Sequence, residues 1–557
     1  MAPSRSVRDV IGNGLRPLAG GLVAGIVIGA VLEWVRLGSL PWVPGREVRL
    51  APAVLAVWAW TSPETVRSLM FRGRPVEPGP LPAHRHRWIA LFFGTAAGLL
   101  WWALPGTFFL VLAFSVGFNS VARSWPLEER TWLGRLIYAA LAARLLFIFF
   151  YYPLASSLGW TAAWFALDVP GFHVPVLFGD GAEAILMSRA WALFWRGEWV
   201  SPGEVSEIFN PDRSVFSIHG DVRHLLPQSF LFFVFGVEPA GARVLSAVVS
   251  VLAGVVGYAA LRDRFGVRAA RWGAALLCFW PTLFLWSLDA LKEPYFILAV
   301  VSSAYFGERF SRGEGRGWLA GSVATLVAAL SIRTRWLPPI ALTAALCLGG
   351  VVIQRALRRF ALWQRIGCGL VALGLVASFA AAWAPGRRLV DYYVLESISA
   401  HRIFATGFGS GYKVWPAQYY SSIMTRLQKT FRWRDAAAAW ANNLGHVLLE
   451  PFPRWWKGRK GIAYFLLAVP WWLALAMAFL GGWKIAIRRA GIGWAYLAYV
   501  AITLGFLAIF SGNVGTLIRH RDSASPVLLM IAAIGVPTLG WRVRFPRLTP
   551  FARKDSA

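Results

Sequence analysis

The chain has 557 residues, of which 57% are hydrophobic and only 15% are charged, with a formal net charge of +29. Soluble globular proteins average about 25% charged and 45–50% apolar residues, so this composition excludes a single water-soluble domain, a disordered chain and a disulfide scaffold. All three cysteines lie within apolar runs, which predicts neither disulfides nor a thiolate metal site. Because the basic residues cluster between apolar segments, we assign most of the positive charge to membrane topology and not to nucleic-acid binding.

Apolar runs recur along the whole chain. A helix crosses the bilayer with about 20 apolar residues, and on this basis the sequence predicts an all-α polytopic membrane protein with about 14 transmembrane helices. In chain order the predicted spans are 17–35, 51–61, 88–104, 105–121, 132–152, 241–261, 272–288, 295–308, 317–332, 336–353, 366–384, 462–483, 491–511 and 526–541. The run at 51–61 is short, but the alternation of loops described next requires it to cross.

The charges of the loops predict their sides. If the spans alternate, four arginine- and lysine-rich loops fall on one side of the membrane: 62–87, 262–271, 354–365 and 484–490. The positive-inside rule makes this side cytoplasmic and places both termini there. The first apolar run reads as an anchor and not as a cleavable signal, so we expect a multi-pass protein of the inner or plasma membrane.

Two longer loops are predicted on the external side. Loop 153–224 holds eight acidic residues against four arginines. Loop 385–461 is longer than the loops of up to about 60 residues to which the positive-inside rule applies. Six of the eight histidines also fall on this side, so we expect any chemistry there. The chain thus divides into an N-terminal transmembrane extension, a core with its external loop 153–224, a second external loop and C-terminal transmembrane helices. Their bounds are 1–131, 132–384, 385–461 and 462–557.

Two segments are predicted to lie in the outer membrane interface. The run 225–236 has only about ten apolar residues, and if it crossed, the basic loop 262–271 would lie outside. The segment 182–196 carries an apolar stripe of tryptophans, phenylalanine and methionine at helical spacing, as interfacial helices do.

Asp180 is the first candidate for chemistry. It starts a helical segment and precedes Glu183 by three residues, which fits an N-cap with a capping box. A second role is compatible with this one. A carboxylate at the rim of an apolar cavity, flanked by Gly179 and Gly181, has a raised proton affinity and suits a general base.

Two short external connections carry further ionisable residues. Asp289, Lys292 and Glu293 lie at a membrane edge, where such groups are costly unless they are paired or functional. The simplest alternative is a local Lys292–Glu293 pair, with Pro294 opening the next helix. We favour a site shared with the acidic first loop.

The second connection holds Arg519, His520 and Arg521, where the positive-inside rule predicts few arginines. Lipid head groups or Asp522 would be ordinary partners, but we favour a bound phosphate, which the arginine fork suits. Weaker candidates of the same kind are Arg223, His224 and Arg243. The sequence holds no zinc-type or nucleotide-binding motif, so neither a metal nor another cofactor is predicted.

The order of these features resembles a known family. Asp180 is followed by a helix ending in Arg-Gly-Glu-Trp, by the interfacial FVFG, by GARVLS and RDRFGVRAA, and by LKEP opening a span. Over roughly residues 132–310 this resembles the GT-C glycosyltransferases of the protein O-mannosyltransferase and lipid A aminoarabinose transferase type.

The resemblance implies inverting transfer of a sugar from a polyprenyl-phosphate carrier to an acceptor glycan, lipid or protein on the external face. Asp180 matches the family's catalytic base, and Glu293 its second acidic position. Where relatives often have Asp-Glu in the first loop, this chain has Asp180-Gly181, and Arg223-His224 replaces a common Lys-Pro element. We expect Asp180, Glu293 and residues 519–521 to converge in one pocket.

Two other classes stay open at this point. A polymer ligase or polymerase of the O-antigen type also pairs external arginines with a long external loop, and His401, Arg402, Arg426 and Arg432 could serve there. A lipid or polysaccharide transporter would instead carry charges inside its spans and an inverted repeat, and the sequence indicates neither.

Overall fold

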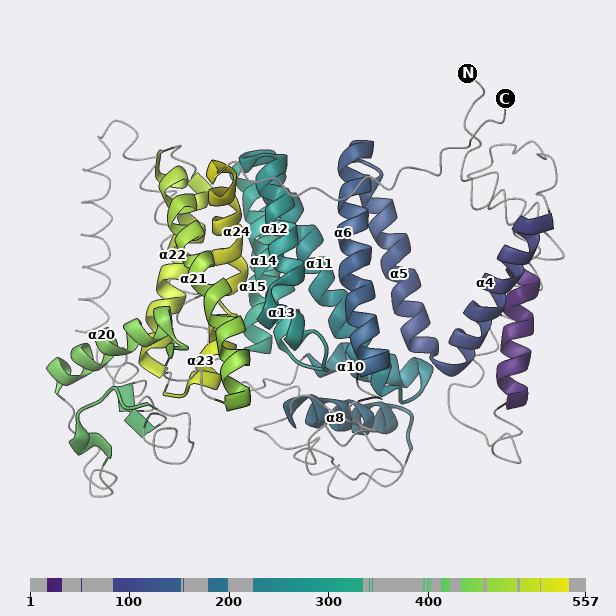
Figure 1. Ribbon diagram of the computed structural model, residues 1–557, viewed down its shortest axis with the longest axis horizontal. Coiled ribbons are helices and arrows are strands. Elements are labelled where there is room, and N and C mark those ends of the chain that lie inside the picture. The colour runs from purple at the N-terminus through teal and green to yellow at the C-terminus, as the bar shows by residue number, and fades with distance from the viewer. Residues whose placement is uncertain are drawn as a thin grey trace. The chain divides into compact units, whose positions relative to one another are not determined.

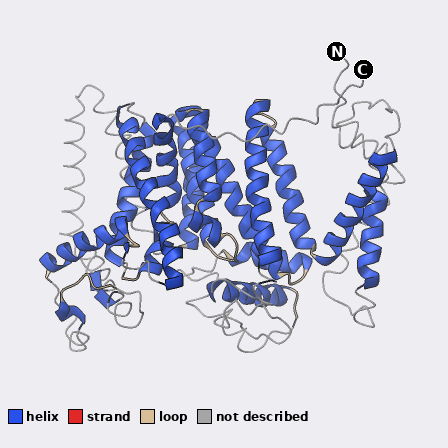
Figure 2. Ribbon diagram, viewed as in Figure 1, coloured by secondary structure: helices blue, strands red, loops and turns tan. Residues whose placement is uncertain are grey.

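The computed structural model describes residues 18–32, 84–151, 179–198, 224–333, 412–420, 432–453, 458–487, 491–510 and 512–539, with a few isolated positions. Within these ranges every element is a helix (Figure 2). The spans predicted at 51–61, 336–353 and 366–384 lie outside them, as do most of loops 153–224 and 385–461. The chain divides into two compact units, called here the first unit (1–130, 141–248 and 288–291) and the second unit (131–140, 249–287 and 292–557).

Five described helices are long and apolar enough to cross a membrane: 105–122, 127–151, 239–265, 464–487 and 492–509. Each coincides with a predicted span to within a few residues. Shorter apolar helices at 18–32, 91–103, 316–332 and 525–535 lie at four further predicted spans. The protein is therefore a membrane protein that is helical throughout its described ranges.

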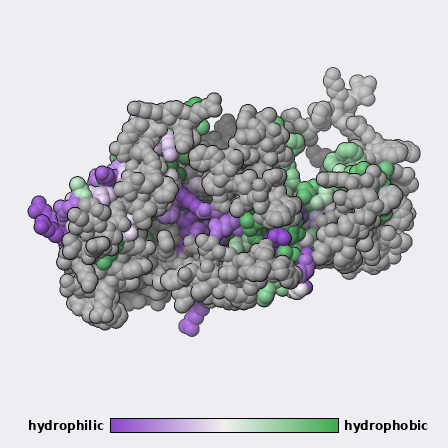
Figure 3. Space-filling model, turned by 90° about the horizontal axis from the view of Figure 1, so that it is seen from below, coloured by the Kyte–Doolittle hydropathy of each residue, from purple (hydrophilic) through white to green (hydrophobic). Residues whose placement is uncertain are grey.

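The surfaces of these helices expose large hydrophobic side chains. Phe92 is 69% exposed, Val116 59% and Phe479 75%. Figure 3 shows such hydrophobic surface in green on one face of the described residues. Helices that are apolar on their outer surface are stable in lipid, where no exposed polar group is needed.

In the first unit, two helices approach each other closely through glycines. Helix Leu18–Leu32 carries Gly21 and Gly25, and α4 (His84–Ala103) carries Gly94 and Gly98. A Cβ atom on any of these glycines would overlap the backbone of the opposite helix. Small residues at four-residue spacing allow this close packing, which drives helix association in membranes.

The helices α8 (Gly179–Trp195) and α10 (Leu225–Phe235) also belong to the first unit and pack against each other. In Figure 1, α8 lies crosswise to α5 (Pro105–Ala122), which contacts α10. Arg196 joins the pair by donating hydrogen bonds to the carbonyl oxygens of Phe232 (2.9 Å) and Phe233 (3.0 Å) at the end of α10. With 11 residues, α10 is about 16 Å long, too short to cross about 30 Å of hydrocarbon.

Glu238 links α5 to the start of α11 (Pro239–Phe265). Its buried carboxylate accepts hydrogen bonds from the backbone N–H groups of Gly106 (2.8 Å) and Thr107 (3.1 Å) and from the Thr107 hydroxyl. The first N–H groups of a helix have no partner within it, so this carboxylate caps α5 from a distant part of the chain.

The second unit is organised around α24 (Ser525–Gly535), in which every residue is buried. It contacts α12 (Val267–Phe279), α21 (Gly458–Ile487) and α22 (Gly491–Phe510). The other described helices of this unit are α13 (Pro281–Trp286), α14 (Glu293–Ser311), α15 (Arg316–Ile332), α20 (Trp433–Leu449) and α23 (Val514–Arg521), with short 3₁₀ turns at Ala417–Tyr420 and Val536–Leu539. Helix α6 (Leu127–Leu146) has residues in both units, and its π-helical continuation (Phe147–Tyr151) belongs to the first.

The run predicted as one span over 272–288 is interrupted in the structure. Helix α12 ends at Phe279, Trp280 is extended (ψ 127°), and α13 starts at Pro281. The ring of a proline disfavours helical backbone at the residue before it, so Pro281 separates the two helices. The break matters for the site because α13 carries Thr282 and Trp286.

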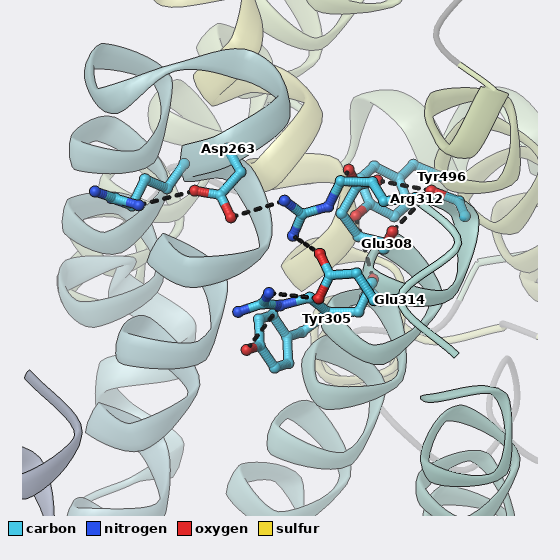
Figure 4. A network of polar contacts seen from close by, with 10 residues as sticks. Asp263, Tyr305, Glu308, Arg312, Glu314 and Tyr496 are labelled. Carbon is cyan, nitrogen blue, oxygen red and sulfur yellow. Dashed lines mark hydrogen bonds and ion pairs between the residues drawn. The ribbon is translucent and has the colours of Figure 1, made fainter. Parts of the chain in front are cut away.

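A network of ion pairs lies at one end of α14 (Figure 4). Arg312 pairs with Asp263 of α11 (2.9 Å) and with Glu314 (3.2 Å), which also pairs with Arg309 (2.6 Å). Glu293 lies at the other end of α14, about 27 Å away for a helix of 19 residues. The basic connection 262–271 and the connection before Glu293 therefore lie at opposite ends of this helix.

Candidate functional site

Glu293 is the centre of a buried ionic cluster in the second unit. Its side chain is 1% exposed, and its Oε1 atom accepts hydrogen bonds from Arg333 Nη2 and Arg519 Nε, both at 2.5 Å. Glu293 begins α14, Arg333 follows the last residue of α15, and Arg519 lies in α23. One carboxylate thus holds together the ends of three helices.

Further contacts hold each arginine in place. Asn513 caps α23, because its Oδ1 atom accepts hydrogen bonds from the N–H groups of Gly515 (2.8 Å) and Thr516 (3.2 Å), which sets the helix that carries Arg519. Arg333 also donates to the Ser523 hydroxyl (2.8 Å) and lies over the ring of Phe296 at 5.4 Å. Arg333 is therefore held on several sides.

Burial and neighbouring charges determine the protonation states of the residues in this cluster. Burial raises the pKa of Glu293, but the charges of Arg333 and Arg519 outweigh this effect and hold the pKa well below its usual range. Burial, aided by the same two arginines, lowers the pKa of His520 to about 3, so this imidazole is neutral at physiological pH. Lys292 also lies close enough to lower the pKa of Glu293 through its charge. We call Lys292, Glu293, Arg333 and Arg519 the Glu293 cluster.

Access to the cluster differs among its members. The side chain of Arg519 is 24% exposed, whereas those of Glu293 and Arg333 are 1% and 5% exposed. Arg519 also lies over the ring of Trp286 in α13, at 6.0 Å from its centroid. Of the two arginines, Arg519 is therefore the one that a ligand from outside can reach, and its contacts with Glu293 and Trp286 hold it in position.

Arg521 makes different contacts. Its Nη2 atom donates to the carbonyl oxygen of His446 (3.1 Å), and its guanidinium lies over Trp471 at 4.8 Å. Burial lowers the pKa of Arg521 to about 10, so it stays cationic. Of the three predicted residues at 519–521, Arg519 and His520 lie beside Glu293, while Arg521 contacts α20 and α21.

Asp522 is a second buried carboxylate in this region. It accepts hydrogen bonds from the Thr282 hydroxyl (2.8 Å) and from the indole N–H of Trp286, both in α13. Burial raises the pKa of Asp522 to about 6, although these hydrogen bonds oppose the shift. Trp286 thus contacts both Arg519 and Asp522.

In the first unit, Asp180 lies in the first turn of α8 and is exposed, as is Glu183. Because α8 begins at Gly179, Asp180 lies within the helix and not at the N-cap position before it. A carboxylate in the first turn interacts favourably with the positive end of the helix dipole. The predicted helix is confirmed, but it begins at Gly179 and not at residue 182, so the N-cap position predicted for Asp180 is wrong.

Asp289 packs against the same helix start. It is fully buried, accepts a hydrogen bond from the N–H of Ala290 (2.9 Å) and pairs with Arg243 Nε at 3.7 Å. A Cβ atom on Gly181 would overlap the Asp289 carboxylate. The glycine that follows Asp180 in this chain is therefore required by the packing of Asp289.

The structure thus brings the predicted residues together in two groups. Asp289 and Arg243 form one group in the first unit, and Glu293, Lys292, Arg519 and His520 form the other in the second unit. His224 is buried at the start of α10, and Arg223 lies outside the described residues. The convergence of Asp180 with Glu293 and residues 519–521 stays a prediction.

Sequence reasoning missed Arg333, Trp286 and the role of Asp522. A signal for Arg333 exists: it follows the apolar run 317–332 on the predicted external side, where the positive-inside rule predicts few arginines. The same criterion singled out Arg519. No comparable signal marks Trp286, one of 31 tryptophans.

Comparisons with known proteins give no relative: no family model, curated protein or solved structure matches this chain. Within the described ranges, no group of three or more histidine, cysteine, aspartate or glutamate residues is placed to hold a metal ion. What the site can do is therefore argued from its own chemistry.

Proposed function

We propose that this protein is a GT-C-type glycosyltransferase that moves a sugar from a polyprenyl-phosphate carrier to an acceptor glycan, lipid or protein on the external face of the cell membrane. The proposal includes about 14 spans, both termini in the cytoplasm and interfacial helices in the first external loop. The observation that carries it is an accessible arginine, Arg519, which a buried carboxylate holds in place at the end of a membrane helix.

A lipid-linked phosphate fits this chemistry. The guanidinium fork matches phosphate oxygens in shape and charge, and its charge persists at all physiological pH values. When the bond between the sugar and the phosphate breaks, the leaving phosphate gains negative charge. A cation that is already fixed stabilises this charge without rearranging, which is the most effective form of electrostatic catalysis.

The environment of Glu293 suits it to anchoring and not to proton transfer. A carboxylate with a pKa below its usual range does not take up a proton near neutral pH. We therefore assign to Glu293 the role of positioning Arg519. For Asp180, the role of base that deprotonates the acceptor hydroxyl rests on the sequence resemblance, and replacement of Asp180 by Asn is expected to abolish transfer.

The alternative classes receive less support. A ligase of the O-antigen type would use His401, but this side chain is fully buried, and burial lowers its pKa to about 4. A neutral, inaccessible imidazole is poorly placed to meet a polymer substrate.

The test is a transfer assay with purified protein and a panel of polyprenyl-phosphate sugars, measuring released polyprenyl phosphate. Replacing Arg519 with Gln should weaken donor binding by about 10- to 100-fold, the value of one hydrogen bond to a charged group. The matched control is Arg312→Gln in the ion-pair network at the other end of α14. The proposal is wrong if no lipid-linked sugar is consumed, or if both variants bind the donor equally well.

A further inference from the structure

Helix α20 lies beside two helices of membrane-spanning length in the second unit. In Figure 1 it runs crosswise to α21 and α22 at their lower end, and it packs against α22. The helix belongs to the stretch 385–461, which the sequence predicts as an external loop. Its contacts with α21 and α22 decide whether it lies in water or at the membrane surface.

Two hydrogen bonds fix α20 beside the last turns of α22. Asn443 Nδ2 donates to the carbonyl oxygen of Ala508 (2.7 Å), and the indole N–H of Trp440 donates to that of Gly505 (2.8 Å). The apolar segment Ile492–Ile509 has 18 residues and is about 27 Å long, no longer than about 30 Å of hydrocarbon. Gly505 lies four residues, or about 6 Å, before the end of this segment. The indole of Trp440 therefore reaches alongside the part of α22 that spans the hydrocarbon.

The C-terminal end of α20 is held by α21. The carbonyl oxygens of Leu448 and Leu449 accept hydrogen bonds from the indole N–H groups of Trp471 (2.8 Å) and Trp472 (2.9 Å). These two tryptophans follow the first residue of the apolar segment 464–487 by about 10–12 Å. The last carbonyl groups of a helix have no partner within it, and here side-chain donors take the place of water. A helix end at membrane depth requires such partners.

The faces of α20 fit a position at the membrane surface. An exposed apolar stripe runs along the helix at spacings of four and three residues, formed by Trp433, Ala437 and Trp440. Because the Trp440 indole reaches Gly505 inside the span, this stripe faces the interior of the bilayer. Asn442 is also exposed and points in nearly the opposite direction from Trp440. No lysine, arginine, aspartate or glutamate occurs from residue 436 to residue 449.

We propose that α20 is an interfacial helix whose apolar stripe lies among the acyl chains of the lipids on the predicted external side. Tryptophans are enriched at this depth, where the ring is apolar and the N–H finds a polar partner. The inference does not depend on sugar transfer. Through Arg521, which donates to the His446 carbonyl oxygen, α20 also holds α23, the helix that carries Arg519.

The test attaches the fluorophore NBD to a single cysteine in the full-length chain, with the three native cysteines replaced by alanine, in phosphatidylcholine nanodiscs. Ala437→Cys places the label in the stripe. Asn442→Cys is the matched control, since its position is also exposed but lies about 140° around the helix. Lipids with a nitroxide near the top of the acyl chain should quench the label at 437 about twofold more than the label at 442. Iodide, which stays in water, should act in the reverse order.

A second comparison keeps the native cysteines. Ala437→Asp should lower the midpoint of thermal unfolding in nanodiscs, because a carboxylate among acyl chains is unfavourable. Ala438→Asp, the same substitution at the next exposed position about 100° around the helix, should change it less.

Three results would overturn the inference. If iodide quenches the label at 437 and the nitroxide lipid does not, α20 lies in water. If neither quencher reaches this label, protein and not lipid covers the stripe. Equal unfolding midpoints of Ala437→Asp and Ala438→Asp would show that the two faces have the same surroundings. None of these measurements involves donor binding, so the proposed function is tested separately.

Discussion

Replacement of Glu293 by Gln tests the ionic cluster directly. The carboxylate is 1% exposed and lies between two guanidinium groups at 2.5 Å. Removing one member of a buried ion pair costs about 3–5 kcal/mol, because the remaining charges stay buried without compensation. Glutamine keeps the volume and one acceptor oxygen, and Arg519 can turn toward solvent, so we expect the lower end, about 3 kcal/mol.

The loss of stability can be measured by thermal unfolding of the purified protein, followed by tryptophan fluorescence. The matched control is Glu314→Gln, which removes a carboxylate that pairs with Arg309 and Arg312 but is 30% exposed. Surface pairs contribute about 0–1 kcal/mol, so its midpoint should change little. If the Glu293→Gln variant unfolds at a midpoint temperature no lower than that of Glu314→Gln, the reasoning is refuted.

The lowered pKa of Glu293 predicts how the stability difference between wild type and Glu293→Gln depends on pH. A carboxyl group whose folded pKa lies below the unfolded value of about 4.5 stabilises the fold above that value and loses the contribution as the pH falls further. The difference between wild type and Glu293→Gln should therefore stay constant from pH 8 to about pH 5 and shrink only in stronger acid.

One more prediction concerns packing. Gly181→Ala should destabilise the protein by about 1–3 kcal/mol in the same unfolding assay, because its Cβ overlaps the Asp289 carboxylate, whereas Gly307→Ala, with ordinary contact distances, should be neutral or slightly stabilising.

The contacts at residues 519–521 show what sequence reasoning could reach. Residues 519–521 stand out because arginines on the predicted external side break the positive-inside rule, and the pairing of Arg519 with Glu293 agrees with the expected convergence of Glu293 with these residues. The sequence predicts a loop at this segment, whereas the structure has helix α23. Residues two apart on a helix point in nearly opposite directions, which is why Arg521 contacts Trp471 and not Glu293.

Hydrophobicity is a property of each segment by itself, and it was enough to determine from the sequence that the protein is helical and membrane-embedded and where five helices of membrane-spanning length lie. Which ionisable groups meet was decided only by the packing of helices from distant parts of the chain. Arg333 reaches Glu293 because α14 and α15 pack together, and Asp522 is buried because α13 lies against the connection after α23. Burial and neighbouring charges then set protonation and access, and neither is encoded in local sequence.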